Sequence, residues 1–119
     1  MELVECGASS SLAPQWTTDV RGHLTVQTLP LRHILDRFPD IRDQCQLLSL
    51  DIEGMEEHAI ESLDWDATRP EVVVVEYHVQ PRPEEDDMRA NAIAELLARY
   101  DYAMVHRDEL NVVFRRATR

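Results

Sequence analysis

Apolar residues recur at the spacing of one helical face in two segments of the chain, at offsets of zero, three, four and seven. These residues are Leu31, Ile34, Leu35 and Phe38 in the first segment, and Ile93, Leu96, Leu97 and Tyr100 in the second. Pro30 suits the first turn of the earlier helix, and Pro39 is expected to end it. A third helix is predicted after Gly54, with an apolar side made of Met55, Ala59, Ile60 and Leu63.

Short apolar runs between these helices have the composition of strands. Residues 46–51 read QLLSLD and predict a short buried strand, and residues 71–78 read EVVVVEYH. The four consecutive valines suit a strand that is covered on both faces, as in a parallel sheet. Residues 23–28 (HLTVQT) predict a weaker strand, and residues 102–106 (YAMVH) and 111–116 (NVVFRR) predict an antiparallel hairpin.

The order of these elements indicates the fold class. Strands and helices alternate, and right-handed crossovers between them imply an α/β protein with a mostly parallel sheet, which the closing antiparallel hairpin makes mixed. The 119 residues match the usual size of a single domain. Residues 1–22 are rich in Ser, Thr and Gly and read mostly as loop, with one short strand expected at residues 2–5.

Composition and charge narrow the classes of function. The apolar share of 44% and the charged share of 29% are ordinary for a soluble globular protein. The net charge of -11 argues against nucleic-acid binding, because phosphate contacts need a basic surface. The sequence shows neither an apolar stretch of about 20 residues nor a secretory signal, so we expect a cytoplasmic protein without a membrane partner. Cys6 and Cys45 lack CxxC spacing and are expected to be free thiols.

Carboxylates stand where two predicted strands end. Asp51 and Glu53 follow the run LLSL, and Glu76 and His78 close the run of valines. In open parallel sheets the ligand crevice lies beyond the carboxyl ends of the strands, and neighbouring strands are about 5 Å apart. These four side chains are therefore candidate catalytic residues, able to accept hydrogen bonds from hydroxyls, remove a proton or bind a hard cation.

These acids also suit roles other than catalysis. Asp51 is equally suited to cap the following helix, and Glu56 and Glu57 would interact favourably with the dipole of that helix. As a mostly oxygen set, the four candidate residues would suit Mg²⁺ or Mn²⁺ better than zinc, although we assign no metal to them. The acids that we expect to be surface charge are Glu56, Glu57, Glu61, Asp64 and Asp66.

Glycine is scarce in this chain. The three glycines, Gly7, Gly22 and Gly54, are widely separated, so the sequence contains no GxGxxG turn, no P-loop and no GxSxG elbow. A nucleotide-type cofactor usually needs a glycine-rich turn, because the backbone must approach the ligand closely there. The residues that would bind such a cofactor are therefore unknown.

The segment LLSLDIEGMEEHAIESL, followed by RPEVVVVEYH, resembles the FkbM family of S-adenosylmethionine-dependent methyltransferases. In the later half of that family's domain, one strand ends in an Asp-x-Glu-Gly-x-Glu segment and a later strand has the form Pro-x-Val-Ile-x-x-Glu. The matching residues here are Asp51, Glu53, Gly54 and Glu56, and then Pro70, Val72, Val73 and Glu76. The stretches GASSSL, VQTLPLRHIL and YDYAMVHRDELNVVFRR are also similar to the family, which usually has Asp at the position of Pro30 and often Gly at that of Asp101.

The resemblance implies a partial Rossmann-like methyltransferase fold, with residues 1–119 forming the C-terminal half of an FkbM-like domain. It implies S-adenosylmethionine-dependent O-methylation of a hydroxylated small molecule or sugar. In that reaction the candidates that orient or deprotonate the acceptor hydroxyl are Asp51, Glu53, Glu76 and His78.

The resemblance also implies that the family's first strands, with the glycine-rich cofactor loop, have no counterpart here. We therefore expect the isolated chain to bind the cofactor weakly and to be inactive. The alternative function is a non-catalytic remnant or binding module, which forms a homo-oligomer or pairs with another chain through an exposed sheet edge.

Overall fold

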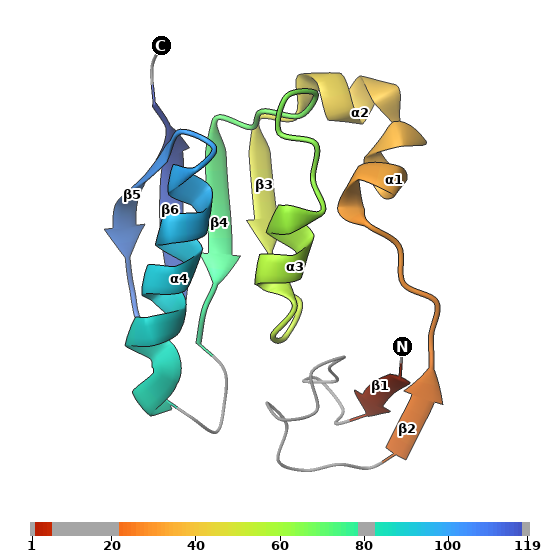
Figure 1. Ribbon diagram of the computed structural model, residues 1–119, viewed down its shortest axis with the longest axis vertical. Coiled ribbons are helices and arrows are strands. Elements are labelled where there is room, and N and C mark those ends of the chain that lie inside the picture. The colour runs from red at the N-terminus through yellow and green to blue at the C-terminus, as the bar shows by residue number, and fades with distance from the viewer. Residues whose placement is uncertain (1, 6–21, 79–82, 118–119) are drawn as a thin grey trace.

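The computed structural model describes residues 2–5, 22–78 and 83–117. The strands among these residues form two separate sheets (Figure 1). The smaller sheet is an antiparallel pair of β1 (Glu2–Glu5) and β2 (Gly22–Thr25). The expected strands at residues 2–5 and 23–28 are therefore present, the second shifted and shorter. The expected loop over most of residues 1–22 falls largely outside the described residues.

The larger sheet has four strands in the order β3-β4-β6-β5 (Figure 1). These strands are β3 (Leu47–Leu50), β4 (Val72–Glu76), β5 (Tyr102–Arg107) and β6 (Asn111–Arg116). Only β3 and β4 run parallel, whereas β6 pairs antiparallel with both β4 and β5. The closing hairpin is confirmed, but the mostly parallel sheet is not. β6 turns back between β4 and β5, and β2 pairs with β1 instead of joining this sheet.

In the described part of the chain, four α-helices and one 3₁₀ turn accompany the strands. They are α1 (Leu31–Asp36), α2 (Pro39–Gln44), α3 (Glu56–Glu61), η3 (Pro83–Glu85) and α4 (Asp86–Ala98). The three predicted helices are confirmed. The first of them, α1, ends at Asp36, before Pro39 as expected, but Phe38, predicted on its apolar face, lies outside it as the N-cap of α2. Pro39 begins α2, because a proline without an N–H fits the first helical turn. Within the described residues, no helix is long and apolar enough to cross a membrane.

The hydrophobic core lies between the four-stranded sheet and the helices α3 and α4, which cover the same face of it (Figure 1). Alternate residues of β4 and β6 point into this core, and the side chains with no exposed surface include Val73, Val75, Val112 and Phe114. Val72 and Val74 point the other way and stay partly exposed. The expectation of a strand covered on both faces was therefore wrong for the described structure, in which the helices pack on one face only.

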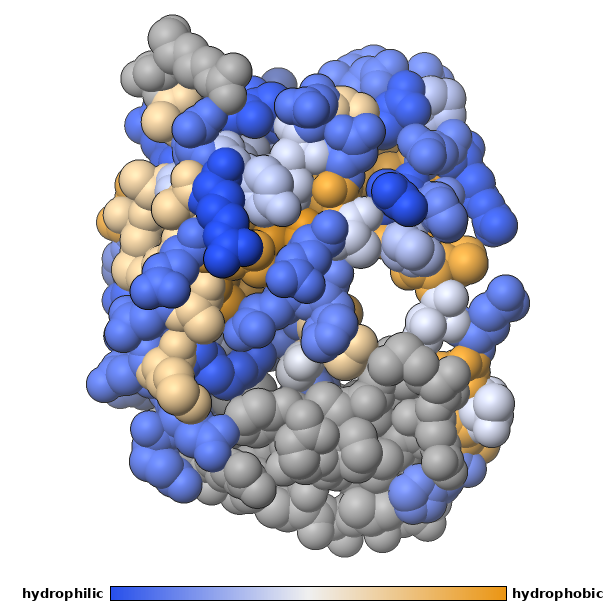
Figure 2. Space-filling model, viewed as in Figure 1, coloured by the Kyte–Doolittle hydropathy of each residue, from blue (hydrophilic) through white to orange (hydrophobic). Residues whose placement is uncertain are grey.

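Hydrophilic residues cover most of the outer surface on the helix side, with hydrophobic residues visible between the elements (Figure 2). Cys45 is a free thiol, and burial raises its pKa. Cys6 lies outside the described residues.

Asp101 occupies the turn between α4 and β5 with a φ of 68°, in the left-handed region. Glycine adopts this conformation most easily, and aspartate tolerates it better than most residues do. A glycine would fit this turn without strain, and Asp101 keeps the turn at a small energetic cost.

Tyr77 anchors the carboxyl end of β4 to the β5–β6 hairpin. Its backbone N–H donates to the Leu110 carbonyl oxygen (2.9 Å), and its hydroxyl donates to the carbonyl oxygen of Asp108. The Arg107 guanidinium lies 4.7 Å from the centre of the Tyr77 ring. Because Tyr77 directly follows Glu76, these contacts hold the end of the strand on which the candidate site depends.

Candidate functional site

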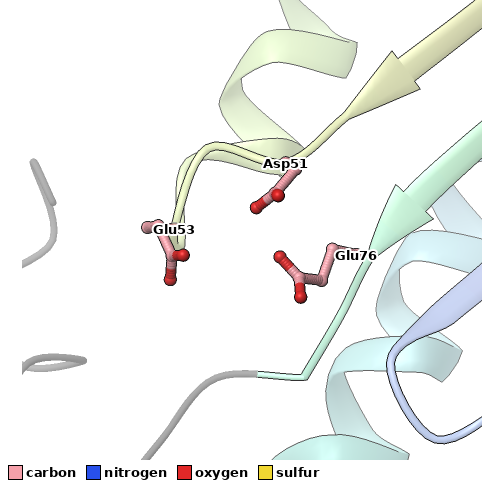
Figure 3. A group of neighbouring side chains, drawn as sticks. All are labelled: Asp51, Glu53 and Glu76. Carbon is pink, nitrogen blue, oxygen red and sulfur yellow. The ribbon is translucent and has the colours of Figure 1, made fainter. Parts of the chain in front are cut away.

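Three of the four candidate residues come together beyond the carboxyl ends of β3 and β4. Asp51 and Glu53 lie on the loop after β3, Glu76 is the last residue of β4, and their carboxylates point toward one another (Figure 3). One carboxylate oxygen from each residue lies within 4.8 Å of the others. Parallel pairing of β3 with β4 produces this convergence, because it brings the carboxyl ends of both strands to the same edge. We call these three residues the carboxylate cluster.

His78, the fourth candidate, is held by a different partner. Its Nδ1 lies 2.6 Å from Asp86 Oδ2, at the start of α4, and both side chains are largely buried. The other carboxylate oxygen of Asp86 is buried and has no hydrogen-bond partner in the described part of the chain. The structure therefore places His78 in a histidine–aspartate pair and not in the carboxylate cluster.

The loop that carries Asp51 and Glu53 has an unusual backbone. Glu53 has a φ of 51° and Gly54 a φ of 102°, so two successive residues are in conformations that favour glycine. For a glutamate this conformation costs on the order of 1 kcal/mol. The sharp reversal directs Glu53 back toward the end of β4, where it meets Glu76 (Figure 3).

The buried carboxylate of Glu56 holds this loop in place. Its side chain is 1% exposed, and its carboxylate accepts hydrogen bonds from the backbone N–H groups of Ile52 (2.9 Å) and Gly54 (3.1 Å). Arg89 of α4 donates to the same carboxylate over 3.0 Å. The expectation that Glu56 is surface charge was therefore wrong. The capping role considered for Asp51 is not seen either, because Met55 occupies the N-cap of α3 without a side-chain hydrogen bond.

A sequence signal for this buried pair does exist. Arg89 precedes Ile93 and Leu97 by four and eight residues, so it lies on the apolar face of α4. A charged residue on a buried helical face requires a buried partner of opposite charge. The last Glu of the Asp-x-Glu-Gly-x-Glu segment is that partner.

The electrostatics of the carboxylate cluster favour a bound proton. Burial, a hydrogen bond with Asp51, and repulsion from Asp51, Glu53 and Glu56 together raise the pKa of Glu76 to about 8. Burial and the negative charges of Asp51 and Glu56 also raise the pKa of Glu53. At neutral pH the cluster therefore keeps a proton on Glu76 that an ordinary surface carboxylate would release.

Comparison with known protein families identifies the family of this chain. The family model described as the methyltransferase FkbM domain matches residues 3–104. The chain belongs to the FkbM methyltransferase domain family. Neither the curated proteins nor the solved structures gave a match.

The loop that carries Asp51 and Glu53 also contributes to an apolar groove of about 480 Å³ in this FkbM domain. Ile52, which lies between the two acids of the loop, contributes to its wall. The other apolar lining residues come from α1, β3, α3 and the segments beside them, and include Leu31, Ile34, Leu50, Met55 and Ala59. The loop after β3 thus contributes acids to the cluster and an apolar residue to the groove.

The described residues suit some ligands of a methyltransferase better than others. The cluster can accept hydrogen bonds from hydroxyls, and its three oxygens are also close enough together to hold one divalent cation. The binding of an anionic group would need free backbone N–H donors, but those of Ile52 and Gly54 are already bound to Glu56. These two N–H groups are therefore not available to an anionic ligand such as the carboxylate of S-adenosylmethionine.

The raised pKa of Glu76 predicts a pH-dependent stability difference for Glu76→Gln. Glu76 has a higher pKa in the folded chain (about 8) than its ordinary value of 4.5, so its contribution to stability is lost as the pH rises between these values. Glutamine does not ionise. The free energy of unfolding of the variant, relative to that of the parent, should therefore rise across this range. This difference should reach only about 1 kcal/mol above pH 8, because water partly screens the charges at the site.

Urea denaturation at pH 5, 7 and 9 measures this difference. Glu61→Gln, which removes one exposed charge from α3, is the matched control and should show no such trend. A difference for Glu76→Gln that is equal at all three pH values would contradict the raised pKa.

The positive φ of Glu53 predicts that two neutral substitutions differ in stability. Glu53→Asn and Glu53→Gln both remove the charge, but asparagine tolerates the left-handed conformation better. Glu53→Asn should therefore be more stable than Glu53→Gln by about 0.5–1 kcal/mol. Thermal or urea unfolding of the two variants, compared at one pH, checks this, and equal stabilities would refute the strained loop.

Proposed function

We propose that this chain forms the acceptor side of a methyltransferase that transfers a methyl group from S-adenosylmethionine to the oxygen of a hydroxylated small molecule. Membership of the FkbM family supports the reaction class. The observation that carries the proposal is the convergence of three carboxylates, one with a pKa of about 8, beyond the ends of two parallel strands. This arrangement suits an acceptor that must lose a proton.

Glu76 is the proposed base in this reaction. With a pKa of about 8, its carboxylate binds a proton more strongly than an ordinary carboxylate and is matched to a pH near neutrality. Asp51 and Glu53 accept hydrogen bonds from acceptor hydroxyls and so hold the reacting oxygen within reach of Glu76. Glu76 would act in its ionised form, the minor form at neutral pH because its pKa is about 8. The acceptor proton would pass to Glu76 Oε as the acceptor oxygen takes the methyl group, while the carbon–sulfur bond of the donor breaks and S-adenosylhomocysteine leaves with the electron pair on sulfur.

The apolar groove indicates which acceptors fit. Its lining is mainly apolar and includes Ile52, the residue between Asp51 and Glu53 in the sequence. An acceptor with a hydroxyl near the acids and an apolar body in the groove would use both features, whereas a small sugar would leave the groove empty. We therefore favour a hydroxylated molecule of polyketide-like character as the acceptor.

Acceptor binding tests this proposal directly. Saturation-transfer NMR at pH 7 with a panel of monosaccharides and hydroxylated aromatic or polyketide compounds should detect binding of the apolar members. Substituting two acids together, as in Asp51→Asn with Glu76→Gln, should weaken that binding at least tenfold, while the Glu61→Gln control should not. If no member of the panel binds, or if binding survives the double substitution, this function is wrong.

The methyl donor is expected to bind poorly to this chain alone. Tight binding needs a concave site that covers most of the ligand and pairs its polar groups. The chain has three separated glycines, and the N–H groups of Ile52 and Gly54 in the loop after β3 are bound to Glu56. Calorimetry with S-adenosylhomocysteine should give a dissociation constant weaker than about 1 mM, equivalent to about -4 kcal/mol. A micromolar constant would show that a donor site is assembled without a glycine-rich turn.

A second candidate function is a binding module that pairs with another chain, here a second copy, through the edge of its sheet. β3 hydrogen-bonds to β4 alone among the described strands, and its sequence LLSL carries no charge, proline or bulge. The opposite edge, β5, has a bulge between Met104 and His106 and ends at Arg107, features that discourage pairing. β3 is therefore the edge that favours strand addition.

Two matched variants test this pairing. Leu47 on β3 and Val105 on β5 are both 59% exposed, on opposite edges of the sheet. Light scattering after size-exclusion chromatography should give a mass above the monomer's 13.8 kDa, reduced to that of the monomer by Leu47→Arg but not by Val105→Arg. A parent protein that is monomeric at 100 μM, or a dimer equally sensitive to both variants, would rule out pairing through β3.

A further inference from the structure

Arg89 of α4 contacts both halves of the acidic site. Its Nη1 donates to the carbonyl oxygen of Tyr77 (2.6 Å), the residue that follows Glu76. Its Nη2 donates to Oε2 of Glu56 (3.0 Å), the carboxylate that binds the backbone of the 51–55 loop. One guanidinium therefore joins the end of β4 to the loop after β3.

We propose that Arg89 is the positioning residue that fixes the separation between Glu76 and the acids of the 51–55 loop. The importance of that separation for an acceptor rests on the proposed function, but the bridge itself does not. Arg89 does not touch the reacting atoms in this scheme and acts through Tyr77 and Glu56.

The burial and shape of this bridge make it rigid. The side chains of Arg89 and Glu56 are 8% and 1% exposed, so water does not compete strongly for their hydrogen bonds. The guanidinium is planar, and its N–H donors point in fixed directions. A lysine has the same charge, but its single nitrogen cannot span the two acceptors in the same way. The charge and the geometry of the bridge can thus be separated by one substitution.

Substitution of Arg89 could change the pKa of Glu76 in two ways, through lost charge or through a change of position, and the two shifts have opposite signs. Removing a nearby positive charge raises the pKa of a carboxyl group, because the anion loses a favourable interaction. Moving Asp51 and Glu53 away from Glu76 lowers that pKa, because burial, hydrogen bonding and repulsion at the cluster all weaken. Arg89→Lys keeps the charge, so a lower pKa in this variant reports a change of position.

The experiment is a carbon-13 NMR titration of the Glu76 carboxyl group in the parent and in Arg89→Lys, with a chelator present to exclude metal ions. The pKa should fall from about 8 by at least one unit, a tenfold loss of proton affinity. Arg69→Lys is the matched control, because Arg69 also donates to a backbone carbonyl, that of Tyr100, but acts away from the cluster. A role limited to stability would lower the unfolding temperature without moving the Glu76 titration, and a shift under 0.3 units would overturn the proposal.

Hydrogen exchange in the parent protein provides a second test that needs no variant. If Arg89 and Glu56 hold the loop to α4, the amides of Ile52 and Gly54 should exchange through the same opening as the Ile93 amide in α4. Exchange from the loop that is at least a hundredfold faster than from Ile93 would show that the loop opens independently, and the bridge would be refuted even if Arg89→Lys did not fold.

Acceptor binding separates this inference from the proposed function. If Glu76 shifts in Arg89→Lys and acceptor affinity also falls while Arg69→Lys changes neither, both proposals are supported. If Glu76 shifts but neither parent nor variants bind any acceptor, the positioning role of Arg89 stands and the proposed function fails.

Discussion

The buried ion pair between Arg89 and Glu56 is the contact on which the arrangement of the acidic site depends. Three parts of the chain meet there: the loop after β3, the end of β4 and the first half of α4. The charges have little exposure to water, and breaking one partner of such a pair is typically destabilising by about 3–5 kcal/mol. The pair therefore couples the position of the loop to the packing of α4 against the sheet.

Much of the fold follows from local patterns in the sequence. The apolar spacing in α1, α3 and α4 and the runs of β3 to β6 were sufficient to predict these elements. Most of them bury one face in the same core, whereas α1 only packs Leu31 and Leu35, partly buried, against it. The order of the strands in the sheet could not be predicted from such local patterns. Nothing in HLTVQT or NVVFRR determines that β2 leaves the main sheet or that β6 inserts between β4 and β5, since pairing depends on contacts between distant residues.

In the candidate site, too, local sequence patterns predicted some of the neighbours, but contacts between distant residues were missed. Asp51, Glu53 and Glu76 could be named as neighbours because parallel strands bring their carboxyl ends to one edge. Glu56 was misjudged because its partner, Arg89, is 33 residues away in the sequence and on another helix. His78 was grouped with the acids because it follows Glu76 by two residues, whereas Asp86 of α4 binds it instead.

The acids of an accidental surface group would be expected to move apart. The acids of the carboxylate cluster are instead restrained in three ways. Repulsion between carboxylates can ordinarily be relieved by rotating a side chain into water, at the loss of only weak contacts. Here Glu53 is held in a left-handed backbone conformation, the N–H groups on either side of it are bound to Glu56, and Glu76 ends a strand that Tyr77 fixes to the neighbouring hairpin. Each restraint works against the repulsion, and together they keep a proton on Glu76 near neutral pH. Local strain and like charges held close together at the carboxyl ends of parallel strands are more typical of a functional site than of surface charge, which is why we favour a chemical role for the cluster.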